Sequence, residues 1–439
     1  MGSYVPTTAA EREQMLAQVG VKSLNDLYAA VPQEMFLHNG LNLPEGLSEL
    51  EVREKVTDLA EKNKVFKTVL RGAGSYRHFI PAVVKSITSR EELVTCYTPY
   101  QAEISQGVLQ GTFEFQTMIC ELTGMDVANA SHYDGATAAA ETIPMCKERK
   151  RNVAYVSETT NPQVIEVMKT YCFASNTELH VVPAKDGKTD AEALKVALGE
   201  NAACFYVQQP NFFGQIEDTV ALGEITHAAG AKFVMGVNPI ACALLPTPRE
   251  VGADVAVCDG QPLGLDTAFG GPYIGFMATT SAMTRKLPGR IVGETKDVDG
   301  KTGYVLTLSA REQHIRREKA SSNICSNQAL CAFTAGVYMA AMGEDGMKQC
   351  ARLCTSKAHY LASELEKIGC KLKYTGEFFH EFVTETACPN CRKKILDALA
   401  EKNILGGAEV DGGILWCVTE LVSKEKLDEV VAIVKEVQG

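Results

Sequence analysis

The sequence lacks the long apolar run that a membrane span requires. None of its uninterrupted hydrophobic stretches approaches the roughly 20 residues that cross a bilayer. It also lacks an excess of basic residues, since 43 lysines and arginines face 54 aspartates and glutamates and the net charge is −11. Nucleic acids and anionic membranes favour basic surfaces, so neither is expected as a partner. The first 16 residues show no signal peptide, and we therefore expect a soluble, cytoplasmic protein.

The signatures of metal and triad chemistry are missing as well. The eight histidines form no HExxH motif and no Ser-His-Asp arrangement. The fifteen cysteines are scattered along 439 residues, which indicates reduced thiols that mostly fill the core. Cys388 and Cys391 form a lone CxxC, which lacks two further zinc ligands and a thioredoxin-like context. The sequence therefore predicts no metal site and leaves a redox role of the cysteines open.

What the sequence does contain, from about residue 150 to 276, is an alternation of short apolar segments and helical segments of about ten residues. Strands that are apolar throughout and are separated by such helices indicate βαβ units and a parallel sheet. The expected strands are 152–157, 179–183, 203–208, 231–237, 253–259 and 269–278. The expected helices are 161–170, 190–199 and 218–230.

Different patterns flank this region. The first 65 residues are helical in character, with a capping box at Thr8 and Glu11 and a weaker helix start at Ser23. After residue 327 a long helical stretch leads into a smaller α/β pattern. We expect an N-terminal helical arm (1–65), a large α/β domain (66–327) and a small C-terminal α/β domain (328–439).

The stretch from Tyr97 to Gly107 predicts a capped helix. Thr98 precedes a proline and pairs with Gln101 as an N-capping box, and the helix is expected to run as far as Gly124. On this helix Gly107 and Gly111 share one face and permit another backbone to pack closely.

Tyr97 and Tyr100 flank the expected start of this helix, where free N–H groups favour anions. A tyrosine there donates a hydrogen bond to a carboxylate or covers a flat aromatic cofactor. Packing and capping alone explain the same residues, so the local sequence leaves both roles open.

Three further segments are candidates for anion binding. Asp134-Gly-Ala-Thr opens an alanine-rich helix whose N–H groups suit a phosphate, although the same turn also fits a plain buried helix start. Positive charge gathers at Arg316 and Arg317, and Arg290 lies in a glycine-flanked loop. A solvated helix with local Arg–Glu pairs is the alternative for the first of these charge clusters. The hydrogen-bonding residues Ser321, Ser322 and Asn323 follow.

Taken together, these segments resemble the glycine cleavage system P-protein family, in particular subunit 1 of its two-chain form. The resemblance covers essentially the whole chain, and it is specific because many motifs occur in the right order. The motifs are Gly72–Pro81, Tyr97–Gly107, Phe113–Asn129, Gly260–Gly264, Phe269–Pro272, Pro288–Gly293 and Arg311–Cys325.

The resemblance implies a fold and a reaction. The fold is the fold-type I, aminotransferase-like architecture of enzymes that depend on pyridoxal 5′-phosphate (PLP), with a mostly parallel seven-stranded sheet in the large domain. The reaction is that of glycine decarboxylase: glycine forms an aldimine with PLP and loses CO₂. The aminomethyl group then passes to the lipoyl arm of H-protein.

Two residue positions test which subunit this chain is. Such enzymes hold PLP through a lysine just after a late strand, but the segment Asp254–Phe276 contains none. They also place a carboxylate opposite the pyridine nitrogen, where this chain has Asn238. Both differences predict that the chain's own pocket is not a working PLP site. The resemblance therefore implies that P-protein subunit 2 binds PLP covalently, in a dimer of heterodimers.

The resemblance also assigns roles in that shared site. Tyr97 and Tyr100 are expected to reach the glycine–PLP adduct, and Arg290, Arg316 and Arg317 to contact anions or the lipoyl entrance. Ser321, Ser322 and Asn323 are expected near the cofactor phosphate. Two alternatives remain: a self-sufficient PLP enzyme such as an aminotransferase or desulfurase, with Lys296 or Lys319 as its lysine, and a purely structural partner.

Overall fold

The structure is a computed structural model that describes residues 6–37, 39–386 and 388–438. Its contacts divide the chain into two compact units, Met1–Lys64 and Val65–Gly439. No helix in the described residues is both long enough and apolar enough to cross a membrane.

The first unit begins with helix α1 (Ala9–Val19). Thr8 Oγ1 accepts a hydrogen bond from Glu11 N at 3.3 Å, and the Glu11 carboxylate accepts one from Thr8 N at 2.7 Å. The predicted capping box is therefore confirmed. The weaker helix start at Ser23 leads only into a short 3-10 helix. The remaining elements of this unit are η1 (Leu24–Tyr28), η2 (Gln33–Met35) and α2 (Glu49–Glu61).

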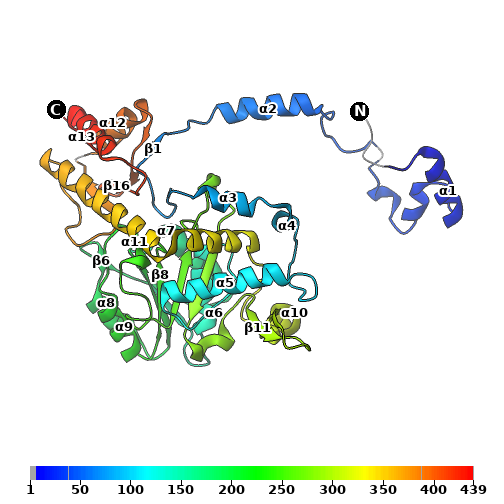
Figure 1. Cartoon of the computed structure of the whole chain (residues 1–439), viewed down its shortest axis with the longest axis horizontal. Helices are drawn as coiled ribbons and strands as arrows, with labels where there is room; N and C mark the ends of the chain where they lie inside the picture. The colour runs from blue at the N-terminus through cyan, green and yellow to red at the C-terminus, as the bar shows by residue number, and fades with distance from the viewer. Residues whose placement is uncertain (1–5, 38, 387, 439) are drawn as a thin grey trace. The chain divides into compact units, whose positions relative to one another are not determined.

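The second unit is built around a seven-stranded sheet (Figure 1). Its strands are β2 (Val127–Ala128), β3 (Val153–Ser157), β4 (Glu178–Val182), β7 (Ala202–Gln209), β8 (Lys232–Val237), β9 (Val255–Asp259) and β10 (Gly275–Thr279). The order is β2-β10-β9-β8-β7-β3-β4, and only the pairs of β10 with β9 and with β2 are antiparallel. The predicted mostly parallel sheet of seven strands is confirmed.

The last strand is shorter than the predicted 269–278. Residues Ala268 to Gly271 have positive φ values between 35° and 154°, which interrupt an extended backbone. The strand therefore begins only at Gly275.

Helices cover both faces of the sheet. They are α5 (Gln106–Thr123), α6 (Gly135–Cys146), α7 (Pro162–Ala174), α8 (Ala191–Ala197), α9 (Thr219–Ala228) and α11 (Ala329–Lys367). Consecutive residues of one strand belong to different apolar clusters: Phe205 packs with α5, α8, α9 and α11, whereas Tyr206 packs with α6 and α7. Both faces are thus buried, as the apolar strands predict.

A smaller α/β layer follows α11. Its elements are β13 (Glu381–Glu385), α12 (Pro389–Glu401), β14 (Ile404–Leu405), β15 (Ala408–Val410), β16 (Gly413–Cys417) and α13 (Lys424–Gln438). Trp416 is fully buried in its apolar cluster. Strand β1 (Thr68–Val69) pairs with β14, so the start of the second unit contributes to this layer. The expected domain division at residues 327 and 328 stays a prediction.

The other elements are short. The hairpins are β5 (Ala184–Lys185) with β6 (Lys188–Thr189), and β11 (Val292–Lys296) with β12 (Thr302–Leu306). The short helices are α3 (Ala82–Thr88), α4 (Glu91–Val94), α10 (Gln313–Arg316), η3 (Ala241–Ala243), η4 (Ala268–Gly270), η5 (Ser281–Lys286), η6 (Ser309–Arg311) and η7 (Arg317–Lys319).

The structure corrects the helix that was expected to begin just after Thr98. Helix α5 begins at Gln106, and its N-cap residue makes no side-chain capping hydrogen bond. Thr98 has a φ of 51°, in the left-handed region, so the predicted capping box with Gln101 does not form. Gln106 is held from outside the helix, because its side-chain amide exchanges two hydrogen bonds of 2.8 Å with the backbone of Tyr304. The predicted end at Gly124 is confirmed.

The close packing expected at two glycines of α5 occurs at one of them. A Cβ atom at Gly111 would lie 2.5 Å from Phe333 Cε2 of α11, whereas one at Gly107 would meet nothing within 4 Å. Figure 1 shows the two helices side by side. Gly111 therefore sets the spacing between α5 and α11.

We predict opposite effects of the same substitution at these two glycines. Gly111→Ala should lower the free energy of unfolding by about 1–3 kcal/mol, because the added methyl group overpacks against Phe333. Gly107→Ala, the matched control, should raise it by about 0.5 kcal/mol, because alanine favours the helix. Chemical denaturation of both variants measures the difference, and equal effects would contradict the packing role of Gly111.

Candidate functional site

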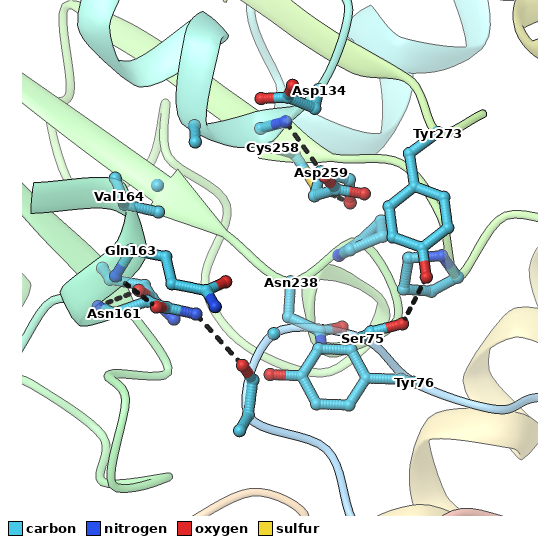
Figure 2. Close-up of a pocket in the computed structure, with 18 of the residues that line it drawn as sticks. Ser75, Tyr76, Asp134, Asn161, Gln163, Val164, Asn238, Cys258, Asp259 and Tyr273 are labelled. Carbon is cyan, nitrogen blue, oxygen red and sulfur yellow. Dashed lines mark hydrogen bonds between the residues drawn. The ribbon is translucent and has the colours of Figure 1, made fainter. Parts of the chain in front are cut away.

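A cavity of about 910 Å³ opens at the carboxyl ends of the parallel strands (Figure 2). Pro210, Asn238 and Asp259 line it from the ends of β7, β8 and β9, and the start of α6 and residues 73–76 complete the wall. Open α/β sheets bind their ligands at this edge. The cavity is therefore where the fold places a cofactor.

The carboxylate of Asp259 lies at the amino-terminal end of α6. Its Oδ2 accepts a hydrogen bond from Gly135 N at 3.0 Å, and its Oδ1 accepts one from Gln261 N at 2.9 Å. Asp134 caps the same helix by accepting a hydrogen bond from Thr137 N at 2.8 Å. Burial raises the pKa of Asp259 to about 6, and repulsion from Asp134 adds to the effect. Two of the N–H groups considered for a phosphate are thus bonded to carboxylates.

Asn238 follows β8 directly and faces the cavity (Figure 2). Its Oδ1 accepts hydrogen bonds from Ile240 N at 2.9 Å and Ala241 N at 3.1 Å. Among the described residues its Nδ2 has no hydrogen-bond partner, although the residue is only 9% exposed. An amide here donates to a ligand but carries no negative charge, which a pyridinium nitrogen needs opposite it.

Two phenols and a carboxyl group, each in a hydrogen bond, form another part of the cavity wall. Tyr76 Oη donates to Glu381 Oε2 at 2.8 Å, and Ala73 N donates to Glu381 Oε1 at 2.7 Å. Ser75 Oγ and Tyr273 Oη lie 2.7 Å apart (Figure 2). Burial raises the pKa of Glu381 to about 7.

Sequence reasoning did not single out these wall residues as site residues. One signal in the sequence was the glycine at position 72. In the structure, a Cβ atom at Gly72 would lie 2.5 Å from Glu381 Oε1. A glycine at such a point permits the backbone to approach a buried group closely. A second signal was Glu381 itself, a carboxyl group directly before the apolar residues Phe382 and Val383.

The residues around this cavity do not fit PLP. Those that the structure describes include neither a lysine for a Schiff base nor an arginine for a phosphate. Lys296 and Lys319, the alternative lysines, are both exposed and do not line the cavity. The carboxyl groups of Asp134, Asp259 and Glu381 disfavour a phosphate further. No step of a PLP reaction is therefore assigned to this cavity.

Two of the site residues expected from the sequence come together elsewhere in the second unit. Tyr100 Oη donates to Asn327 Oδ1 at 2.6 Å, and the guanidinium carbon of Arg290 lies 4.7 Å from the centre of the Tyr100 ring. Arg290 also forms a 2.5 Å ion pair with Glu312 and donates from Nε to Cys325 O at 2.9 Å. Arg290 is therefore held by Glu312 and Cys325 with its guanidinium group over the Tyr100 ring.

The remaining expected residues are mostly at the surface. Tyr97 is 88% exposed, and Arg316, Arg317 and Asn323 are also exposed. Ser321 and Ser322 line a small basic pocket of about 30 Å³, with residues such as Arg285, Lys286 and Arg311. None of these tyrosines, arginines, serines or Asn323 lines the large cavity, whereas Asp134, Gly135 and Ala136 of the candidate phosphate segment do.

The Cys388 and Cys391 pair lies at the start of a helix. Cys388 is the N-cap residue of α12, and its Sγ accepts a hydrogen bond from Cys391 N at 3.1 Å. Both thiols are free.

Comparisons with known proteins identify the family of the chain. The family model of the glycine cleavage system P-protein matches residues 2–434. A protein of Desulfitobacterium hafniense named probable glycine dehydrogenase (decarboxylating) subunit 1 is 48% identical over 447 residues, covering 99% of this chain and 100% of that protein. A crystal structure of glycine decarboxylase (P-protein) of the glycine cleavage system, in inhibitor-bound form, is 41% identical with a TM-score of 0.92, covering 99% of this chain and 100% of that one.

The fold extends to more distant proteins. Alanine–glyoxylate aminotransferase from Nostoc sp. shares it at 15% identity and a TM-score of 0.61, covering 85% of this chain and 96% of that one. The fold is thus that of the fold-type I, PLP-dependent class, and the described lining of the cavity contains no lysine and no arginine. Within that class, the chain belongs to the glycine cleavage system P-protein family. The resemblance and the fold predicted from the sequence are both confirmed.

The buried carboxyl group of Glu381 predicts a pH dependence of stability. Its pKa is raised from 4.5 to about 7, so the folded chain binds this proton more tightly than the unfolded chain. The contribution of Glu381 to stability therefore falls as pH rises from about 4.5 to about 7. Glu381→Gln does not titrate, so its stability relative to the wild type should rise across this window in denaturant unfolding.

The matched control is Glu385→Gln, at the exposed end of the same strand. It should show no such trend relative to the wild type. A stability difference between Glu381→Gln and the wild type that stays constant between pH 5 and 8 would contradict the raised pKa of Glu381.

Proposed function

We propose that this chain is subunit 1 of a two-chain glycine dehydrogenase (decarboxylating), the P-protein of the glycine cleavage system. Together with subunit 2 it decarboxylates glycine and transfers the aminomethyl group to the lipoyl arm of H-protein. One observation carries the proposal: a family match over nearly the whole chain occurs together with a cavity that lacks the PLP lysine. Subunit 2 accordingly holds PLP covalently, and this chain completes the shared site.

The catalytic contribution of this chain is assigned to Tyr97 and Tyr100. The exposure of Tyr97 leaves it accessible to a partner chain. Tyr100 has its ring fixed by Arg290 and its hydroxyl group by Asn327. The two phenols lie three positions apart in sequence, one fixed and one exposed, and such a pair suits binding and orientation of a glycine carboxylate.

Anion contacts are assigned to the exposed segment around residues 316–323. Ser321 and Ser322 lie beside the positive side chains of a small pocket, which supports contacts with the cofactor phosphate of subunit 2. Asn323 is assigned to the same phosphate. Arg316 and Arg317 are exposed on an otherwise acidic protein and suit the substrate or lipoyl entrance. Arg290 contributes through Tyr100.

The partners follow from the same assignment. They are P-protein subunit 2, lipoylated H-protein and glycine, in a dimer of heterodimers in the cytoplasm. The net charge of −11 supports the absence of nucleic acid and anionic membrane from this set.

Two other functions were open from the sequence. A self-sufficient aminotransferase or desulfurase is disfavoured, because neither Lys296 nor Lys319 is among the residues that line the cavity. A purely structural subunit is distinguished from a catalytic one only by substitution of the tyrosines.

We predict that Tyr97→Phe slows glycine/bicarbonate exchange by the reconstituted two-subunit complex at least about tenfold. The loss corresponds to about 1.4 kcal/mol, the size of a hydrogen bond to a charged group. Tyr100→Phe should also slow exchange, because it removes the hydrogen bonds that hold Asn327.

The matched control is Tyr28→Phe, an exposed tyrosine of the first unit, which should leave the exchange rate unchanged. Full rate and unchanged glycine affinity in both Tyr97→Phe and Tyr100→Phe would support the structural reading instead.

A further inference from the structure

A second group of chemically active side chains lies outside the cavity. It consists of His78, Cys350, Cys354 and Glu420, which we call the His-Cys-Cys-Glu cluster. Cys350 and Cys354 stand four residues apart on α11, so they share one face of the helix. His78 precedes α3, and Glu420 lies between β16 and α13. One ligand atom from each of the four residues lies within 4.8 Å of all the others.

The spacing of these atoms fits a tetrahedral zinc site. Zn–S distances of about 2.3 Å and Zn–N or Zn–O distances of about 2.0–2.1 Å place neighbouring ligand atoms about 3.3–3.8 Å apart. Here Cys350 Sγ lies 3.7 Å from His78 Nδ1, and Cys354 Sγ lies 3.4 Å from Glu420 Oε2. His78 Nδ1 and Glu420 Oε2 lie closer, at 2.8 Å. An ion needs this pair to separate slightly, and all four ligand atoms already lie within 4.8 Å of one another.

The surroundings favour a cation at this point. His78, Cys350 and Cys354 are buried and Glu420 is partly buried, so two thiols, an imidazole and a carboxylate converge away from solvent. Glu420 is also held from outside the cluster, since its Oε1 accepts a hydrogen bond from Phe79 N at 2.6 Å. Contacts of this kind orient the carboxylates that bind metals.

We propose that the His-Cys-Cys-Glu cluster binds one zinc-type divalent cation as a structural site. Four protein ligands leave no open position, which is the pattern of structural rather than catalytic zinc. Binding displaces the two thiol protons and also removes from His78 Nδ1 the proton that it shares with Glu420, so that two thiolates, the Nδ1 lone pair and the carboxylate coordinate the cation. The ion joins α11 to the loop before α13 and to the segment that carries Tyr76 into the cavity.

This proposal is independent of the function proposed above, and it departs from the absence of a metal site expected from the sequence. The ligands have no motif spacing, because His78 and Cys350 lie 272 positions apart. Only the fold brings them together.

The test uses the purified full-length chain, loaded with Zn²⁺ and passed through gel filtration with a weak chelator. We expect about one zinc per chain by elemental mass spectrometry. Loading with Co²⁺ instead should give the intense visible bands and the thiolate-to-metal charge-transfer band of tetrahedral sulfur ligation. A weak octahedral Co²⁺ spectrum from the folded wild-type chain would overturn the proposal, whatever the variants do.

The variants locate the metal. Cys350→Ser/Cys354→Ser should lower the retained zinc at least tenfold and abolish the rise in melting temperature that zinc gives the wild type. Cys331→Ser, at another buried cysteine of α11, should retain the ion. Equal zinc in the wild type and the double variant would place the metal elsewhere, for instance at Cys388 and Cys391, and overturn the assignment.

Discussion

The hydrogen bond from Gly135 N to the Asp259 carboxylate is the contact on which the interpretation of this chain depends. It occupies the start of α6, where the fold would otherwise direct free N–H groups towards a phosphate. The two backbones approach so closely here that only glycine fits at position 135, since a Cβ atom there would lie 2.5 Å from Asp259 N. Asp134 and Glu381 add further acidic groups, and Asn238 supplies an uncharged amide where a carboxylate is needed. The cavity lies where this fold binds its ligands, but the residues described around it do not fit PLP.

The proposed division of labour between the subunits rests on that lining. Under this proposal, the chain contributes to the reaction through groups that reach the cofactor of subunit 2. Tyr97 is exposed, whereas Tyr100 is fixed by Arg290 and Asn327, so the two phenols differ in freedom although they lie three positions apart. The proposed metal cluster concerns a different part of the second unit, the junction of α11 with the C-terminal layer. It bears on stability, and the shared site does not depend on it.

Much of the fold was predictable because its causes are local. Apolar strands separated by short helices indicated the parallel sheet. The absence of a PLP lysine could be recognised once the late strands were placed along the sequence. The start of α5 was not predictable, because Gln106 is held by Tyr304, 198 positions away. The cavity wall was missed for the same reason: Tyr76 lies in the Gly72–Pro81 motif, but its partner Glu381 is 305 positions away and belongs to none of the motifs. Arg290 was identified as a candidate because it is an arginine in a glycine-flanked loop. Its contacts with Tyr100 and Glu312 became visible only in the structure.

The most direct test of the central claim is to locate the cofactor in the assembled enzyme. The two-subunit complex, reconstituted with PLP, is reduced with borohydride, digested and analysed by mass spectrometry for the phosphopyridoxyl lysine. The account predicts that all of the label is found on a lysine of subunit 2 and none on this chain. A phosphopyridoxyl lysine in this chain, at Lys296, Lys319 or any other position, would contradict it.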